Sequence, residues 1–131
     1  MSSAGTHGTF DDVVLRAKPA LRSVCESLRR LIVALHKNVV EVAWPGQRIA
    51  SFGVGPKKMS EHYAYIAVHA SHVNLGLYHG AVLTDRAGLL EGDGKRLRHV
   101  KLRDVSSTRN PAIRALLMEA IADRKRQARG A

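Results

Sequence analysis

The chain has 131 residues, of which 45% are hydrophobic, and 21 lysines and arginines against 11 aspartates and glutamates give a formal net charge of +10. This length favours one domain and this composition excludes a disordered chain. No apolar run approaches the roughly 18 residues that a membrane-spanning helix needs, and the first residues lack the pattern of a signal peptide. We therefore expect one domain over residues 1–131, with flexible ends at 1–9 and 125–131.

Cysteine usage and the distribution of charge indicate the compartment and the kind of partner. Cys25 is the one cysteine, so no intramolecular disulfide can form, and this favours a reducing cytoplasm. Residues 1–85 contain 9 basic and 6 acidic side chains, whereas residues 86–131 contain 12 and 5. This surplus suits an anionic partner. A solvated basic surface accounts for the same numbers.

The first third of the chain predicts helices. Residues 10–17 form a short helix with Asp11 and Asp12 at its start, where negative charge is favourable. Pro19 suits the first position of a second helix over roughly 19–37. Apolar side chains recur there at three- and four-residue steps, as in an amphipathic helix. They are Leu21, Val24, Cys25, Leu28, Leu31, Ile32 and Leu35.

Two strands are expected next, over residues 39–44 and 48–54. Pro45-Gly46 predicts a type II turn between them, because glycine tolerates the positive φ that this turn needs. The basic loop over 55–58 then makes Lys58 a candidate residue at the rim of a site.

Residues 63–78 predict a β-hairpin, because residues 63–69 and 72–78 both alternate in polarity. Pairing the two runs turns one aliphatic set toward the core. That set is Ala64, Ile66, Val68, Val73, Leu75 and Leu77. The opposite face then carries Tyr63, Tyr65, His69, His72, Asn74 and Tyr78. Such an aromatic and amide surface is unusual for a solvated sheet, so we expect either a ligand face or a face that another element covers.

The remaining segments complete the predicted fold. Residues 80–87 form a short helix or turn, 88–95 a loop, and 97–102 a fifth strand. Asn110-Pro111 begins the last helix, with asparagine as cap and proline at the first position. The predicted fold class is α+β, a curved antiparallel sheet of about five strands with N-terminal and C-terminal helices packed on it.

The loop GLLEGDGK resembles a phosphate-binding loop but does not satisfy that motif. Its glycines are one residue too far apart, Arg96 replaces the hydroxyl that would hold magnesium, and a strand follows where a helix is needed. A weaker hypothesis keeps Gly92 and Gly94 as backbone donors to an anion, with charge from Lys95, Arg96 and Arg98. A glycine-rich turn with exposed bases explains the same residues.

Other kinds of site find little support in the sequence. His69, His72 and His79 lie close together but lack a carboxylate or cysteine partner at metal-ligand spacing. No nucleophile elbow surrounds Ser60 or Ser71. Helix-turn-helix, zinc-finger and RRM signatures are missing too, so specific nucleic-acid binding is not expected. We predict no catalytic residues, no metal site and no cofactor.

The segments HVNLGLYHGA (72–81) and GLLEGDGKRLRHVKL (88–102) resemble the YdhG-like domain family, a widespread family of unknown function. The resemblance extends from about Phe10 to Ile121. It implies a single intracellular α+β domain and supplies no general catalytic residues. One branch of the family is linked to frataxin-like iron delivery. That role depends on an acidic surface, from which this chain departs with its net charge of +10.

The leading hypothesis from the sequence is a non-enzymatic binding domain that holds a small anionic ligand on the polar-aromatic sheet face. The expected ligand-binding residues are Lys58, Tyr65, Asn74, Tyr78, Lys95 and His99. The alternatives are metal or iron delivery, nucleic-acid binding, and an interaction module whose sheet face pairs with a second copy to form a homodimer. No membrane partner is expected.

Overall fold

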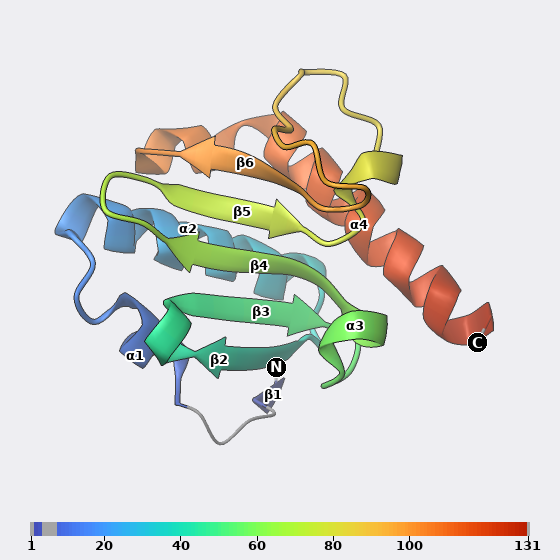
Figure 1. Cartoon of the computed structure of the whole chain (residues 1–131), viewed down its shortest axis with the longest axis horizontal. Coiled ribbons are helices and arrows are strands. Elements are labelled where there is room, and N and C mark those ends of the chain that lie inside the picture. Colours follow the sequence, from blue (N-terminus) through green and yellow to red (C-terminus); the bar gives the residue numbers. More distant parts are fainter. Residues whose placement is uncertain (1, 4–7, 131) are drawn as a thin grey trace.

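The computed structural model describes residues 2–3 and 8–130, which form one sheet with helices packed on one side (Figure 1). In spatial and sequence order the strands are β1 (Ser2–Ser3), β2 (Val40–Trp44), β3 (Ile49–Gly53), β4 (His62–Val68), β5 (Val73–Leu77) and β6 (Arg98–Leu102). The helices are α1 (Phe10–Val14), α2 (Pro19–Leu35), α3 (Lys58–Glu61) and α4 (Pro111–Gly130), with 3-10 turns η1 (Pro45–Gln47), η2 (Gly80–Val82) and η3 (Val105–Arg109). Strands β2 to β6 are antiparallel and β1 is parallel to β2. The expected α+β class is confirmed.

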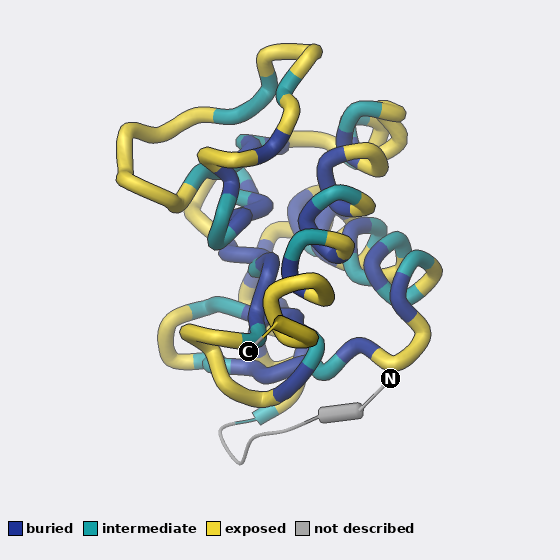
Figure 2. Tube along the Cα trace, turned by 90° about the vertical axis from the view of Figure 1, so that its right-hand side faces the viewer, coloured by how far each residue is buried: buried dark blue, intermediate teal, exposed yellow. Residues whose placement is uncertain are grey.

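The hydrophobic core lies between the sheet and helices α2 and α4, as the end-on view shows (Figure 2). The predicted stripe of α2 faces inward, and Leu28 and Ile32 are both 0% exposed. Burying one such side chain contributes about 1.5–3 kcal/mol. Cys25 lies on the same stripe, and its burial raises the pKa of the thiol to about 12. It is therefore a packing residue and not a nucleophile at neutral pH.

The hairpin of β4 and β5 has the predicted register. The aliphatic pairs across it are Ala64 with Leu77, Ile66 with Leu75, and Val68 with Val73. All six are buried on the helix side of the sheet. Alternation fixed this pairing because a slip of one residue would turn the whole set toward solvent.

Tyr63 lies on the other side of the sheet from the one predicted. The pairing of β3 with β4 shifts between Phe52 and Gly53, and this leaves Tyr63 unpaired in a bulge. The extra residue reverses the alternation at that point, so Tyr63 enters the core at 2% exposure. Its hydroxyl forms a 2.9 Å hydrogen bond with Nδ1 of His36, just after α2.

The turn between β2 and β3 also differs from the prediction. Pro45 begins the 3-10 turn η1 instead of a type II turn, and Gly46 does not take positive φ. The left-handed residue is Arg48, with φ of 59°. Its backbone N–H donates to the carbonyl of Pro45 at 3.0 Å. This bond closes the tight turn that starts β3.

The C-terminal helix begins as predicted. The side-chain oxygen of Asn110 accepts from the backbone N–H of Ala112 at 3.0 Å, and Pro111 is the first residue of α4. Residues 125–130, expected to be flexible, continue this helix. Of the other residues with expected flexibility, 1, 4–7 and 131 lie outside the described part of the chain. No helix among the described residues has the length and apolarity needed to cross a membrane.

Candidate functional site

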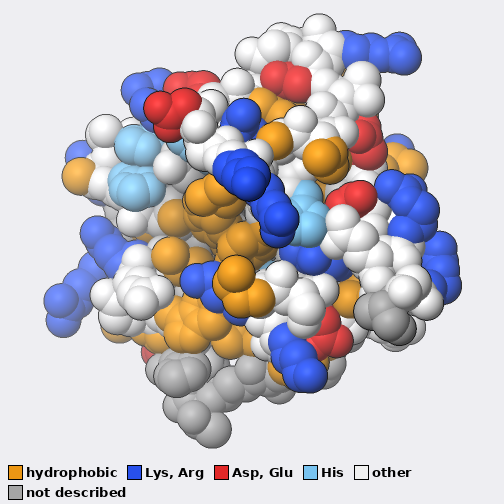
Figure 3. Space-filling view, turned by 45° about the vertical axis from the view of Figure 1, so that its right-hand side comes forward, with side chains coloured by type: hydrophobic (Ala, Val, Ile, Leu, Met, Phe, Trp, Pro, Cys, Tyr) orange, Lys and Arg blue, Asp and Glu red, His pale blue; other side chains and the backbone are white. Residues whose placement is uncertain are grey.

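One side of the sheet faces away from α2 and α4, and we call it the open sheet face (Figure 1). Strand pairing and ring contacts bring onto it Trp44, Ser51, His62, Tyr65, Asn74, Tyr78 and His99. Figure 3 shows hydrophobic side chains gathered in the middle of the visible surface, with basic and histidine side chains around them. The sequence predicted this polar-aromatic character.

A buried hydrogen-bonded cluster lies at the centre of the open sheet face. The hydroxyl of Ser51 is 2.6 Å from Nδ1 of His62 and 2.9 Å from the hydroxyl of Tyr78. Burial, and then the charge of Arg124, lower the pKa of His62 to about 4. Ser51 and His62 are both 0% exposed, so no substrate reaches the serine hydroxyl in this conformation. The pair joins β3 to β4 and does not present a nucleophile.

Three of the predicted ligand-binding residues lie together on this face. The ring of Tyr65 covers Gly76, where an added Cβ would lie 2.0 Å from ring atoms. The ring centroids of Tyr65 and Tyr78 are 5.4 Å apart. His99 lies opposite Gly76 on the neighbouring strand, next to the residue that the Tyr65 ring covers.

The other three predicted residues lie apart from that group. Asn74 is near the hairpin turn, where its Nδ2 is 3.4 Å from Nε2 of His69. Lys58 is exposed on α3, with its Nζ 5.4 Å from the centroid of the Trp44 ring. Lys95 is exposed and lines a separate cavity. The structure therefore does not bring the six residues into one cavity.

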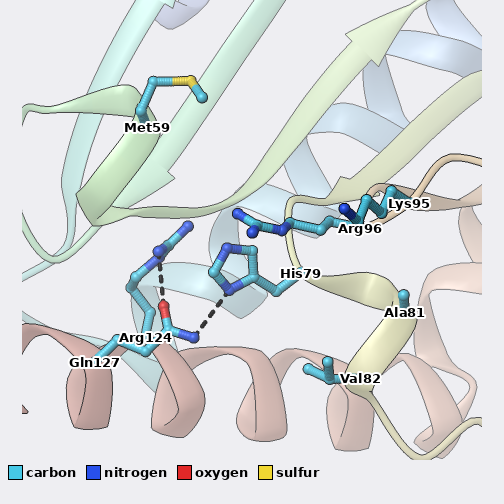
Figure 4. Close-up of a pocket in the computed structure, with 8 residues that line it drawn as sticks. All are labelled: Met59, His79, Ala81, Val82, Lys95, Arg96, Arg124 and Gln127. Carbon is cyan, nitrogen blue, oxygen red and sulfur yellow. Dashed lines mark hydrogen bonds between the residues drawn. The ribbon is translucent and has the colours of Figure 1, made fainter.

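That cavity, which we call the basic pocket, has a volume of about 440 Å³ and lies where α3, η2, the loop before β6 and α4 meet. Its lining residues are Met59, His79, Ala81, Val82, Lys95, Arg96, Arg124 and Gln127. In Figure 4 the guanidinium groups of Arg96 and Arg124 point toward the same space, with the ring of His79 beside it. The lining contains no aspartate or glutamate among the described residues.

Arg124 is a buried residue of the basic pocket, with 4% of its surface exposed. Its Nε donates to the carbonyl of His62 and its Nη1 to Oε1 of Gln127, both at 2.8 Å. No carboxylate in the described part of the chain forms a hydrogen bond or ion pair with Arg124. The neighbouring Asp123 contacts Arg126 at 3.3 Å, Gln127 at 3.3 Å and His79 at 3.4 Å. Burial lowers the pKa of Arg124. The hydrogen-bond partners of this buried guanidinium are neutral, and the Asp123 carboxylate only partly offsets its charge through space, by raising the pKa.

Gln127 links Arg124 to His79 and fixes the orientation of the imidazole. Its Oε1 accepts from Arg124, so its Nε2 is turned toward Nδ1 of His79, 3.0 Å away. An amide nitrogen can only donate, and Nδ1 of the neutral ring must therefore accept. The ring proton is then on Nε2, the nitrogen that Figure 4 shows directed at the space near Arg96. Asp123 Oδ2, 3.4 Å from Nδ1, would pair with a protonated ring.

Arg124 is not among the ligand-binding residues predicted from the sequence. The missed signal is periodic: Arg124 follows Ala120 and Ile121 by four and three residues, so it continues the apolar stripe of α4. Arg98, expected to add charge near an anion, instead donates to the carbonyl oxygen of Gly94 and closes the loop.

The histidines outside the basic pocket do not form a metal site in the described residues. Within residues 2–3 and 8–130, no group of three or more histidine, cysteine, aspartate or glutamate side chains is placed to hold a metal ion. His69 and His72 stack with ring centroids 4.6 Å apart and an angle of 15° between the planes. This arrangement presents ring faces to each other rather than converging nitrogens.

Comparisons of the chain with protein-family models, with curated proteins and with solved structures find no match. The resemblance to the YdhG-like family therefore stays a prediction from the sequence segments that carry it.

Proposed function

We propose that the protein is a binding domain for a small organic anion and that the basic pocket holds the charged group of that anion. The observation that carries this proposal is the buried guanidinium of Arg124, which has only neutral hydrogen-bond acceptors. A bound oxyanion would supply charge-assisted hydrogen bonds to Nη2, for which no described residue is a partner, and these bonds are about twice as strong as neutral ones.

The size and lining of the basic pocket support the proposal. A volume of about 440 Å³ falls within the range of small-molecule sites, roughly 300–1,000 Å³. Arg124 and His79 are donors held in place by Gln127, whereas Lys95 and Arg96 are exposed on a loop. The pocket thus combines fixed donors, which orient a ligand, with outer cations that attract it. Cationic donors of this kind hold an anion.

The open sheet face supports the wall of the basic pocket. Arg124 is anchored on the carbonyl of His62, and the side chain of His62 is held in turn by Ser51. Tyr78 bonds to the same serine and directly precedes His79 in the chain. In this proposal the face that the sequence singled out positions the pocket residues, and its tyrosines and tryptophan are not part of the pocket lining.

The proposal is tested by calorimetry with a panel of organic phosphates, sulfates and carboxylates at low salt. A ligand present at one hundred times its Kd should also raise the free energy of unfolding by about 2.7 kcal/mol. The informative variant is Gln127→Glu, because it places a carboxylate of the same size against Arg124. This internal counter-ion should weaken anion binding by at least about tenfold. The substitution also removes the hydrogen bond from Gln127 Nε2 to Asp123 Oδ2, so a denaturant titration checks that the variant is folded.

Arg114→Gln is the matched control. Arg114 is exposed on the same helix, does not line the basic pocket, and its replacement lowers the net charge by one, as Gln127→Glu does. We expect it to bind anions as the wild type does. Equal affinity in wild type and Gln127→Glu, or no binding of any anion in the panel, would overturn the proposal.

A further inference from the structure

The basic pocket has apolar side chains at its edges. The exposed large hydrophobic side chains of the described chain are Leu15, Met59, Val82, Leu97 and Met118. Two of them line this pocket, Met59 at 85% and Val82 at 68% exposure. Figure 4 shows them on different sides of the guanidinium groups, one from α3 and the other from η2. Apolar surface beside a charged cavity suits a ligand that has a charged head and an apolar body.

The charge of the lining favours a dianion over a monoanion. Lys95, Arg96 and Arg124 are all cationic, and a carboxylate neutralises only one of them. A phosphate monoester carries a charge of about −1.5 to −2 at neutral pH and has three terminal oxygens. Those oxygens can accept from both guanidinium groups and from the Nε2–H of His79 together. The guanidinium fork matches the geometry of phosphate oxygens.

We infer that the ligand is a phosphate monoester with an apolar or aromatic substituent. Its phosphoryl group lies between Arg96 and Arg124, and its substituent lies against Met59 and Val82. This inference rests on the proposed anion-binding function and narrows it to one ligand class.

The first experiment compares phenyl phosphate, phenyl sulfate, benzoate and inorganic phosphate by calorimetry on the full chain, at one salt concentration and about pH 7.5, where the monoester is dianionic. Phenyl phosphate and phenyl sulfate share their shape and differ by about one charge. We expect phenyl phosphate to bind at least about tenfold more tightly than phenyl sulfate or benzoate, a gain typical of an added charged contact. It should also bind more tightly than inorganic phosphate.

The second experiment replaces the apolar edges. Met59→Ser and Val82→Ser change exposed side chains, so the fold should tolerate them. Each should weaken the binding of phenyl phosphate by about three- to tenfold and leave the affinity for inorganic phosphate unchanged, because only the substituent loses apolar contact. Met118→Ser is the control, since Met118 is also exposed but does not line the pocket. Its affinity for both ligands should equal that of the wild type.

These outcomes separate the inference from the proposed function. Equal binding of phenyl phosphate and phenyl sulfate would overturn the ligand class and leave anion binding in place. If Met59→Ser and Val82→Ser lose affinity for phenyl phosphate and for inorganic phosphate to a similar extent, the placement of the substituent would be overturned. No binding of any of the four ligands would overturn both. Vesicles containing phosphatidic acid then show whether the phosphate monoester is a lipid headgroup or a soluble ester. Binding of phenyl phosphate supports the inference whether or not the protein also binds these vesicles.

Discussion

His62 illustrates how burial sets the chemistry of a single side chain. Its Nδ1 is 2.6 Å from the Ser51 hydroxyl, and its Nε2 is buried without a hydrogen-bond partner among the described residues. Protonation would place a second N–H, and a charge, in this site beside Arg124. Burial and that neighbour therefore hold the pKa at about 4 in the folded chain, below the ordinary value of 6.5.

This shift predicts that stability falls in mild acid. Because the pKa of His62 is lower in the folded state, the unfolded chain binds more protons between about pH 6.5 and 4. The contribution of His62 is complete above about pH 6.5 and is lost as pH decreases toward 4, at most about 3 kcal/mol. Burial also lowers the pKa of His36, which adds a change in the same direction.

Urea denaturation across this pH range checks that prediction. His62→Gln should flatten the dependence of the unfolding free energy on pH, whatever its effect on stability at neutral pH. An unchanged slope in the variant would show that His62 does not titrate as the structure implies.

At the scale of elements, one ion pair connects α2 to the sheet. The guanidinium of Arg29 contacts both carboxylate oxygens of Glu41, with Nε 2.6 Å from Oε2 and Nη2 3.1 Å from Oε1. Glu41 is 4% exposed on β2. A two-pronged contact with a buried carboxylate positions the helix on the strand more firmly than an exposed pair would.

Glu41→Gln should therefore lower the free energy of unfolding by about 1–3 kcal/mol, because a neutral amide then faces Arg29 in a buried site in place of the carboxylate. Denaturant titration at neutral pH measures this loss. Glu91→Gln removes the same charge at an exposed position and should stay within about 0.5 kcal/mol of the wild type. Similar losses in the two variants would contradict the role given to the ion pair.

The elements themselves could largely be predicted, because their signals are local. The apolar stripe of α2 and the alternation in β4 and β5 each fall within one segment, and the structure confirms both. The face of the sheet that carries Tyr63 could not be predicted, because the bulge depends on how β4 pairs with Phe52 and Gly53 of β3. The left-handed Arg48 likewise depends on the path between β2 and β3.

The candidate site was harder to predict than the elements. Tyr65, Tyr78 and His99 come together because they occupy nearby positions on adjacent strands. The basic pocket, in contrast, is assembled from α3, η2, the loop before β6 and α4, and no local pattern shows that these segments meet. Arg124 on the apolar stripe of α4 was the one periodic signal of a buried cation. The ligand-binding roles of the six residues chosen from the sequence stay predictions.

At the scale of the whole molecule, the net charge of +10 predicts attraction to any polyanion. Binding to nucleic acid should fall steeply between about 50 and 200 mM salt, because each phosphate contact releases counter-ions. Binding of a small anion in the basic pocket should fall much less, since few counter-ions are released. Titrations of a single-stranded oligonucleotide and of phenyl phosphate over that salt range test the difference. Oligonucleotide binding that persists at 200 mM salt would favour the nucleic-acid alternative.

The proposed role of Arg124 is to hold the charge of a small anion in the basic pocket. Calorimetric titration of phenyl phosphate into wild type, Gln127→Glu and Arg114→Gln tests it most directly. If Arg124 has this role, wild type and Arg114→Gln should have similar Kd values, and Gln127→Glu should have a Kd at least about tenfold higher. Equal affinity in all three proteins, or an equal loss in both variants, would contradict it.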